Sequence, residues 1–426
     1  MKLEKSKNYL KSARSLIPGL SQTFSKAPYS YVEGVYPTYL TRGKGAYVYD
    51  VDNNKYLDYV LSLGPIILGY NYPNVNKEIK KQIKNGFSFS IPHILELELS
   101  KKIQEIIPNT DMVRFSKTGS DACTAAIRCA RAFTKRNHIA YCGTGGVWHD
   151  WFTAITSRNE GIPKFNKKLI HKFNFNDIDS LKKIVEKHKD DLASIFIEPI
   201  TLEYPKKNFL KQVKNIAKEV GAVLIFDEVV TGFRYALGGA QEYLNISADI
   251  TTFGKGIANG MPLGAITGKE EIMQKFSDIF YSTTYGGETL SLAACSAVID
   301  EIKEKPVLQH ITKLSKNLYS EFNKISKEID INIKMEGTDV RSIINFYDSK
   351  NNLSLLLKSL FYQETIKNGI LFGPGAVLLS YSHTQKDVQR TLAICENAMR
   401  KMKKLENIKQ PEKLLKGNQI KPVMTF

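Results

Sequence analysis

The sequence has little of what marks secreted, membrane-spanning or cysteine-zinc proteins. Its 426 residues contain only five cysteines, with no CxxC pair, so neither a disulfide framework nor a cysteine zinc pattern is expected. No run approaches the roughly 20 apolar residues of a membrane span. Residues 1–16 mix acids with bases and lack an apolar core, unlike a secretory signal. We therefore expect a cytoplasmic protein with reduced thiols and no membrane partner.

Acidic residues are scarce relative to basic ones. Lysine and arginine total 60 against 43 aspartates and glutamates, which gives a formal net charge of +17. Such a charge can serve nucleic acid or an anionic ligand. However, the lysines are spread along the chain, no basic run is interleaved with aromatics, and no helix-turn-helix pattern occurs. We expect no nucleic-acid partner, whereas steering of phosphorylated or nucleotide-linked substrates remains open.

The order of strand-like and helix-like segments predicts the fold class. They alternate between about residues 112 and 268, which is typical of an α/β domain with a parallel sheet. From residue 306 the pattern changes to a mixture of helices and short strands. We predict an N-terminal segment over 1–60 that packs with the small domain, a large domain over 61–303 and a small α+β domain over 304–426.

The segment 221–264 holds the first candidate site. An apolar run, Ala222–Phe226, stops at Asp227, and a second strand-like run over 249–253 leads to Lys255, which has a glycine on each side. The carboxyl ends of parallel strands are where such sheets bind ligands. Pyridoxal phosphate chemistry needs a lysine for a Schiff base and a carboxylate facing the ring nitrogen. An edge aspartate and a solvated lysine are the equally favoured alternative.

The segment 112–133 predicts an anion site. A strand-like run over 112–115 is followed by a turn with hydroxyls and a glycine, and then by a helix from Ala122. The N-terminus of a helix favours a phosphate, and Ser120 would add a hydroxyl donor. Taken alone, the turn fits better with ordinary N-capping by Ser120 or Asp121.

Both tryptophans of the chain, Trp148 and Trp151, lie just after a glycine-rich turn, and His149 lies between them. Tryptophan and histidine in this setting suit stacking on a planar ring. Two aromatic core anchors are the alternative. His149 and Asp150 lack metal-ligand spacing and a third ligand, so we expect no metal site.

Together these segments resemble the class III pyridoxal-phosphate aminotransferases, above all the glutamate-1-semialdehyde 2,1-aminomutases, over about residues 9–399. The likeness lies in residues 44–52, 56–60, 64–69, 112–115, 118–122, 126–131, 226–234 and 252–264. It implies fold type I and a homodimer. It also implies pyridoxal 5'-phosphate as cofactor, with pyridoxamine 5'-phosphate as the intermediate form.

The resemblance implies catalytic roles for two residues. Lys255 would hold the cofactor as a Schiff base and then move protons as base and acid. Asp227 would pair with the pyridinium nitrogen. Val229 would pack on one face of the ring.

The resemblance also implies which residues bind the phosphate and the ring of the cofactor. Gly119 and Ser120 would hold the phosphate, and Thr284 would reach the phosphate bound to the partner subunit. The family's usual Tyr-His-Gly is absent at the ring-stacking position, so Trp148 is the first choice there and His149 the second.

Three departures from the aminomutase pattern touch substrate recognition. The segment Trp151–Phe173 is much shorter than the aminomutase gating loop, which retains the intermediate. The carboxylate-binding arginine near the N-terminus has no clear match, and Lys26 cannot replace its bidentate fork. The loop over 373–380 is shorter and lacks the family's glutamate.

These departures favour an aminotransferase that acts on small molecules. It would move an amino group from an amino acid donor, first of all glutamate, to a carbonyl acceptor. A sugar-like, phosphorylated or nucleotide-linked substrate of surface-polysaccharide biosynthesis is the expected acceptor class. The alternatives are a glutamate-1-semialdehyde 2,1-aminomutase of tetrapyrrole synthesis, and a cofactor-free regulatory or binding protein on the same fold.

Overall fold

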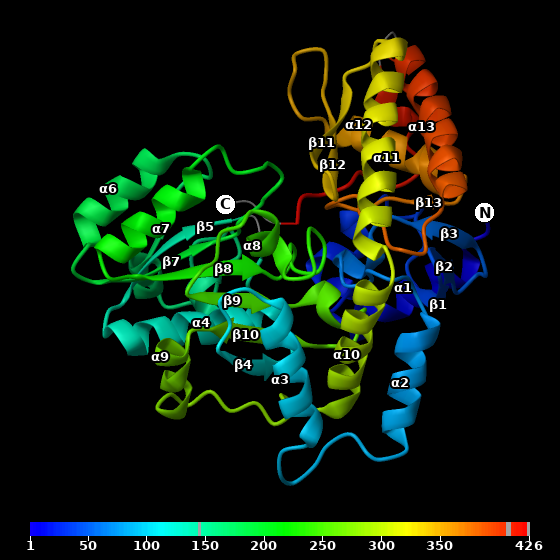
Figure 1. Ribbon diagram of the computed structural model, residues 1–426. Coiled ribbons are helices and arrows are strands. Elements are labelled where there is room, and N and C mark those ends of the chain that lie inside the picture. The colour runs from blue at the N-terminus through cyan, green and yellow to red at the C-terminus, as the bar shows by residue number, and fades with distance from the viewer. Residues whose placement is uncertain (144–145, 406–409, 424–426) are drawn as a thin grey trace. The chain divides into compact units, whose positions relative to one another are not determined.

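The computed structural model describes residues 1–143, 146–405 and 410–423 (Figure 1). Contacts divide the described chain into two compact units. We call residues 73–308 the central unit, and residues 1–72 together with 309–423 the terminal unit. None of the helices within the described ranges is both long and apolar enough to cross a bilayer.

The central unit is built on a seven-stranded sheet with the order β4-β10-β9-β8-β7-β5-β6. Only β10 runs antiparallel to its neighbours, β4 and β9, and the other pairs are parallel. The expected α/β fold with a mostly parallel central sheet is confirmed. The strands are β4 (Met112–Ser116), β5 (His138–Cys142), β6 (Ile170–Lys172), β7 (Leu192–Ile197), β8 (Val223–Glu228), β9 (Ile250–Phe253) and β10 (Gly264–Gly268).

Helices cover both faces of this sheet, with α4 on one side and α6 and α7 on the other (Figure 1). The α-helices of the central unit are α2 (Pro73–Ile83), α3 (Ile94–Ile106), α4 (Gly119–Thr134), α5 (Asp150–Thr153), α6 (Ile178–His188), α7 (Phe209–Glu219), α8 (Gly239–Tyr243), α9 (Glu270–Met273) and α10 (Thr289–Glu304). The short 3-10 helices are η5 (Lys164–Leu169), η6 (Lys255–Ala258) and η7 (Gln274–Ser277).

Strand β8 illustrates why the sequence forms this buried sheet. All six of its residues are buried, and successive side chains of a strand point to opposite faces. Ile225 joins the core that contains α4, whereas Leu224 and Phe226 join the core that contains α6 and α7. An unbroken apolar run is what a strand with two covered faces requires.

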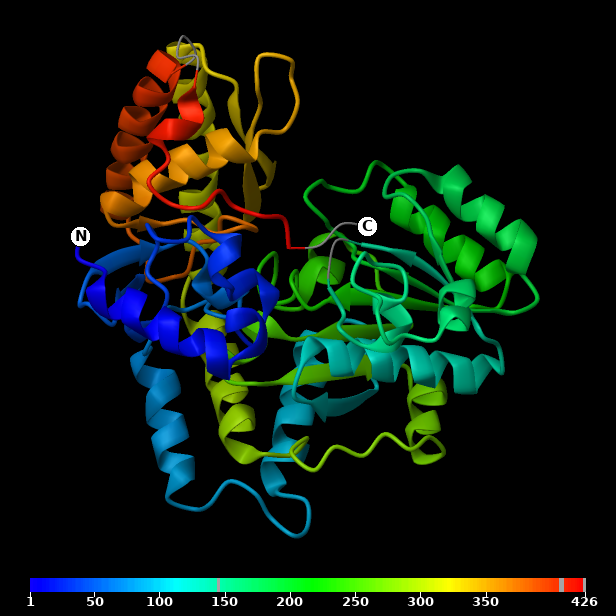
Figure 2. The same ribbon diagram turned by 180° about the vertical axis from the view of Figure 1, so that it is seen from behind.

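The terminal unit is built from both the N-terminal and the C-terminal part of the chain. Its four-stranded sheet has the order β1-β2-β3-β13, and β13 pairs in parallel with β3. Helices α11 and α13 run side by side in both views (Figure 1, Figure 2). The elements are α1 (Glu4–Leu16), η1 (Pro18–Leu20), η2 (Phe24–Lys26), η3 (Pro28–Ser30), β1 (Leu40–Lys44), β2 (Tyr47–Asp50), β3 (Lys55–Asp58), η4 (Leu61–Leu63), α11 (Val307–Ile329), β11 (Ile333–Thr338), β12 (Arg341–Phe346), α12 (Leu355–Lys367), β13 (Ile370–Leu371), α13 (Gln385–Leu405) and η8 (Pro411–Leu414).

One expected strand is shorter than its pattern suggested. The apolar run over 370–380 indicates a long strand, but β13 ends at Leu371. Pro374 lies between two glycines shortly afterwards. Proline cannot donate to a strand ladder and glycine weakens one, so the chain leaves the sheet there.

Candidate active site

The carboxyl ends of β4, β8 and β9 lie at the same edge of the sheet. Strand β10 runs opposite to β4 and β9, and β8 runs parallel to β9. Asp227 pairs with Thr252, three residues before Lys255. Burial and the Asp227 carboxylate raise the pKa of Cys123 in α4, and the Lys255 ammonium acts in the opposite direction. Both predicted catalytic side chains therefore lie within electrostatic reach of one buried thiol.

Lys255 adopts an unusual backbone conformation. Its φ is +43°, in the left-handed region that costs a residue with a Cβ roughly 1–2 kcal/mol. It follows the last residues of β9 and begins η6, and its side chain is half-buried. Such strain at the end of a buried strand is typical of a functional position.

Three residues from different segments pack together beside Asp227. A Cβ built on Gly119 would lie 2.6 Å from Val229 Cγ1, and one built on Gly254 would lie 3.3 Å from both Gly119 Cα and Val229 Cγ1. The Val229 N–H donates to Asp227 Oδ1 at 3.0 Å. The absence of side chains on both glycines thus lets Val229 and the two backbone segments pack this closely, and we call this group of three residues the glycine cradle.

The turn before α4 is organised by Thr118. The Thr118 hydroxyl accepts from the Asp121 N–H at 3.1 Å, and the Asp121 carboxylate accepts from the Thr118 N–H at 2.9 Å. The expectation that Ser120 or Asp121 would cap the helix is wrong, because this reciprocal pair makes Thr118 the N-cap. Gly119 and Ser120 become the first two helical residues, whose N–H groups have no acceptor inside the helix and can face an anion.

Trp148 and His149 both lie at the N-terminus of α4. The Trp148 N–H donates to Ser120 Oγ at 3.3 Å, and His149 Nε2 lies 3.2 Å from Asp121 Oδ1. Although burial acts to raise the pKa of Asp121, hydrogen bonds from His149 and Thr118 lower it, so this carboxylate is ionised. The two aromatic rings are 4.1 Å apart. Which of them stacks on a bound ring stays a prediction.

Trp151 takes the other role that the sequence left open for the tryptophans. Its ring is 7% exposed, and its Nε1–H donates to Thr124 Oγ1 in α4 at 2.9 Å. Trp148, in contrast, is 65% exposed. One tryptophan is therefore a core anchor, and the other is accessible to a ligand.

Thr284 lies in an exposed turn next to β4. The Gly286 N–H donates to Thr283 O at 2.9 Å, and a Cβ on Gly286 would lie 3.3 Å from Phe115 O. Lys117 and Glu288 form an ion pair at 3.0 Å at the end of this loop. Within the described part of the chain, Thr284 forms no hydrogen bond or ion pair with Lys255 or Asp227.

Glu228 is a structural residue that the sequence did not single out. It is fully buried, and its carboxylate accepts from Thr231 Oγ1 at 2.8 Å, Ala240 N at 2.5 Å and Gln241 N at 2.9 Å. Burial raises its pKa to about 7, although these three donors act to lower it. Glu228 therefore fixes the loop that follows Asp227. Its position directly after that aspartate was the only signal in the sequence.

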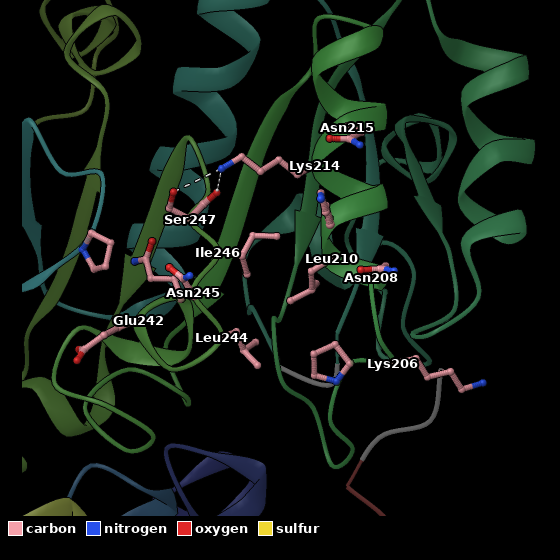
Figure 3. A pocket seen from close by; sticks show the side chains of 14 residues that line it. Lys206, Asn208, Leu210, Lys214, Asn215, Glu242, Leu244, Asn245, Ile246 and Ser247 are labelled. Carbon is pink, nitrogen blue, oxygen red and sulfur yellow. Dashed lines mark hydrogen bonds between the residues drawn. The ribbon is translucent and has the colours of Figure 1, made fainter.

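A second hollow lies elsewhere in the central unit, where α7 faces the segment 244–247 (Figure 3). It has a volume of about 790 Å³ and is lined by none of the predicted site residues. Lys214 points across it and donates to Ser247 O at 2.7 Å (Figure 3). The cofactor cradle and this hollow are thus different places.

The clustered residues define a class of protein. A mostly parallel sheet carries a carboxylate, a lysine, a glycine cradle and an open helix N-terminus at one edge, as a pyridoxal-phosphate enzyme of fold type I requires. The sequence pattern of the family Aminotransferase class-III matches residues 29–376. The chain belongs to this family of pyridoxal-phosphate-dependent aminotransferases and is an enzyme.

The chain is similar to known aminotransferases and aminomutases along almost its full length. The chain is 35% identical to a 3-aminobutyryl-CoA aminotransferase of Cloacimonas acidaminovorans over 95% of this chain and 99% of the relative. It is 34% identical to a glutamate-1-semialdehyde 2,1-aminomutase of Acetivibrio thermocellus over 92% and 97%. The solved FumI protein of Sphingopyxis sp. MTA144, in its pyridoxal-phosphate form, is 25% identical with a TM-score of 0.89, over 96% of this chain and 99% of that one.

The cofactor follows from this membership. Pyridoxal 5'-phosphate is the cofactor, with pyridoxamine 5'-phosphate as its intermediate form. The cradle at Gly119 and Gly254, the carboxylate of Asp227 and the open N–H groups of α4 fit a flat ring with a phosphate. Membership in this family argues against the alternative of a cofactor-free binding protein.

A matched pair of glycines tests the role of Glu228. Gly239 and Gly161 have similar φ values of +86° and +79°, but a Cβ would lie 2.5 Å from Glu228 Oε2 at Gly239 and would meet nothing within 4 Å at Gly161. We expect Gly161→Ala to cost roughly 1–2 kcal/mol through its φ alone. Gly239→Ala should lower the thermal unfolding midpoint clearly further, because the bound carboxylate must move. Equal midpoints would contradict the clamping role of Glu228.

Proposed function

We propose that Lys255 and Asp227 are the catalytic residues of an aminotransferase. Pyridoxal phosphate, when bound, supplies a reactive aldehyde and an electron-withdrawing ring. Lys255 Nζ takes a proton from the α-carbon of the amino donor and returns one to the former carbonyl carbon of the acceptor. The Asp227 carboxylate keeps a facing ring nitrogen protonated. The observation that carries this proposal is that Asp227 at the end of β8 is paired with Thr252 of β9, three residues before Lys255, beside the glycine cradle.

The surrounding residues would position the cofactor. The N–H groups of Gly119 and Ser120, with the Ser120 hydroxyl, bind the phosphate at the positive end of α4. Val229 packs on one face of the ring. Trp148 covers the other face, with His149 as the second choice; the high exposure of Trp148 supports its availability.

Substitution of the two catalytic residues tests these roles. Lys255→Ala should abolish turnover and the borohydride-sensitive covalent link to the cofactor. Asp227→Ala should retain cofactor poorly and lose nearly all turnover. Lys211→Ala, an exposed lysine of α7, is the control and should behave as the wild type. A covalent link that persists in Lys255→Ala, or near-normal turnover in Asp227→Ala, would overturn the assignment.

We further propose that the amino group passes from glutamate to a carbonyl group on an anionic, nucleotide-linked carrier. The similarity to a 3-aminobutyryl-CoA aminotransferase supports this class, because coenzyme A is such a carrier. The net charge of +17 would attract it. A keto nucleotide sugar of surface-polysaccharide biosynthesis has the same chemistry of recognition and is the second acceptor to test.

The segment between the ring-stacking position and β6 supports release of the product. Trp151 and Phe152, at its beginning, are buried in the core that contains α4. An aminomutase must retain its intermediate between two half-reactions. A short segment that is anchored in this way is poorly suited to act as a long closing lid, which favours transfer between two separate substrates.

A glutamate-1-semialdehyde 2,1-aminomutase is the second candidate, favoured by relatives of that name at 34% identity. Its reaction moves an amino group within one molecule and needs no separate donor. This difference makes the two candidates separable in one assay.

The decisive assay follows the absorbance of the cofactor in the purified enzyme. Glutamate should convert it to the amino form, and 3-oxobutyryl-CoA should then restore the aldehyde form. The matched control is 3-oxobutyrate without coenzyme A, which should react far more slowly. Salt should raise KM more for the nucleotide-linked acceptor than for the singly charged 3-oxobutyrate. Rapid formation of 5-aminolevulinate from glutamate-1-semialdehyde alone would overturn the proposal in favour of the aminomutase.

We also propose a homodimer in which Thr284 binds the phosphate held by the partner subunit. Its exposure, and its place in a loop tied down by the Lys117–Glu288 ion pair, support a role toward another chain. A two-fold dimer would then contain two such shared sites.

Mixed dimers test this arrangement. Thr284→Val and Lys255→Ala should each impair the homodimer, the first through weaker phosphate binding. A dimer with one chain of each kind should regain activity, because one of its two sites would combine an intact Lys255 with an intact Thr284. Purification through two different tags isolates this dimer. Activity no higher than the average of the two parent homodimers would contradict sharing between subunits.

A further inference from the structure

Three of the seven histidines of the chain meet at one place in the central unit. His138, His171 and His188 each offer a ring nitrogen, and these atoms all lie within 4.8 Å of one another. His138 Nδ1 and His171 Nε2 are 2.7 Å apart. All three rings are half-buried and stack nearly parallel, with interplanar angles of 15–20°.

The topology of the sheet explains how these residues come together. His171 in β6 is in register with Ala140 of β5, two residues after His138. Side chains two residues apart share a face of a strand, so His138 and His171 project toward the same side. Helix α6 covers that face through Leu181, and its last residue is His188.

From this cluster we propose that His138, His171 and His188 bind a divalent transition metal, with zinc as the first candidate. Imidazole nitrogens are preferred ligands of zinc, at about 2.0–2.1 Å, and tetrahedral geometry then separates the nitrogens by about 3.3 Å. Because the rings are stacked, they would turn out of the stack on binding so that one nitrogen of each ring points at the metal. Water or a carboxylate fills the fourth position.

Asp191 provides the outer support that a histidine ligand needs. While Nδ1 of His138 faces His171, its Nε2 lies 3.5 Å from Asp191 Oδ2. The carboxylate is itself held by the Asn137 N–H, which donates to Asp191 Oδ1 at 2.9 Å. A carboxylate on the far nitrogen orients a metal-bound imidazole and makes it a better ligand.

The electrostatic setting also suits a metal cation. The C-terminus of α6 adds a partial negative charge next to His188. Lys187 is a nearby cation, and the Asp191 carboxylate offsets it in part.

The metal would act on structure. Strand β6 has three residues and forms the edge of the sheet. A bound zinc would tie it to β5 and to the end of α6 and thereby hold the edge. The cluster contains none of the residues assigned to the cofactor, so this site is independent of the proposed reaction.

Zinc uptake by the full-length holoenzyme tests the proposal. After treatment with a chelator, the protein is dialysed against micromolar zinc, and metal per chain is measured by elemental analysis. The wild type should bind one zinc per chain, with three nitrogens at about 2.0–2.1 Å by X-ray absorption. Zinc should also raise the thermal unfolding midpoint and slow hydrogen exchange in residues 164–172.

Two ligand variants and a matched control decide the outcome. His188→Ala should fold, because alanine is favourable at the end of a helix, and it should lose the zinc, as should His171→Ala. Asp191→Asn should weaken binding roughly 10–100-fold. His93→Asn removes a histidine outside the cluster but can still cap α3, and it should bind as the wild type does. Unchanged zinc uptake in His188→Ala, or none in the wild type, would overturn the proposal and leave a hydrogen bond between imidazoles.

Discussion

The close approach of Gly119 to Val229 is the contact on which the geometry of the cofactor site depends. Gly119 begins α4, and Val229 follows the carboxylate of Asp227 by two residues. A side chain at position 119 would lie 2.6 Å from Val229, so it would push the helix N-terminus away from the end of β8. The turn before α4 and the carboxylate of Asp227 belong to different segments, and this contact, with the packing of α4 on the sheet, sets the spacing between them.

Asp227 and Glu228, at the end of β8, have different roles because successive side chains of a strand point to opposite faces of the sheet. Asp227 shares the side of Ile225, where α4 begins, and Glu228 points to the opposite side with Phe226. There Glu228 binds Thr231 and the N–H groups of Ala240 and Gln241. One carboxylate is left beside the cradle, and the other is consumed in fixing the loop that follows. The loop in turn holds Val229 in place.

The sequence predicted the parts of this site that depend on local pattern. Unbroken apolar runs identified β8 and β9, and their ends located Asp227 and Lys255. The capping residue was missed because both Thr118 and Ser120 carry a hydroxyl, and the choice depends on the reciprocal bond with Asp121. The prediction of a long strand after residue 370 was wrong because proline interrupts an otherwise apolar run.

Contacts that depend on register are beyond any local pattern. His138 and His171 are 33 residues apart in sequence, and only the parallel pairing of β5 with β6 brings them together. His138 is the first residue of β5, whereas Asp227 is near the end of β8. These strands run in parallel with β7 between them. The histidines therefore lie near the amino ends of the strands and the glycine cradle near their carboxyl ends, most of a strand length away at about 3.3 Å per residue. A metal at the histidines would therefore hold the outermost strand, β6, against β5. The chemistry at the carboxyl ends of the strands would proceed through its own residues.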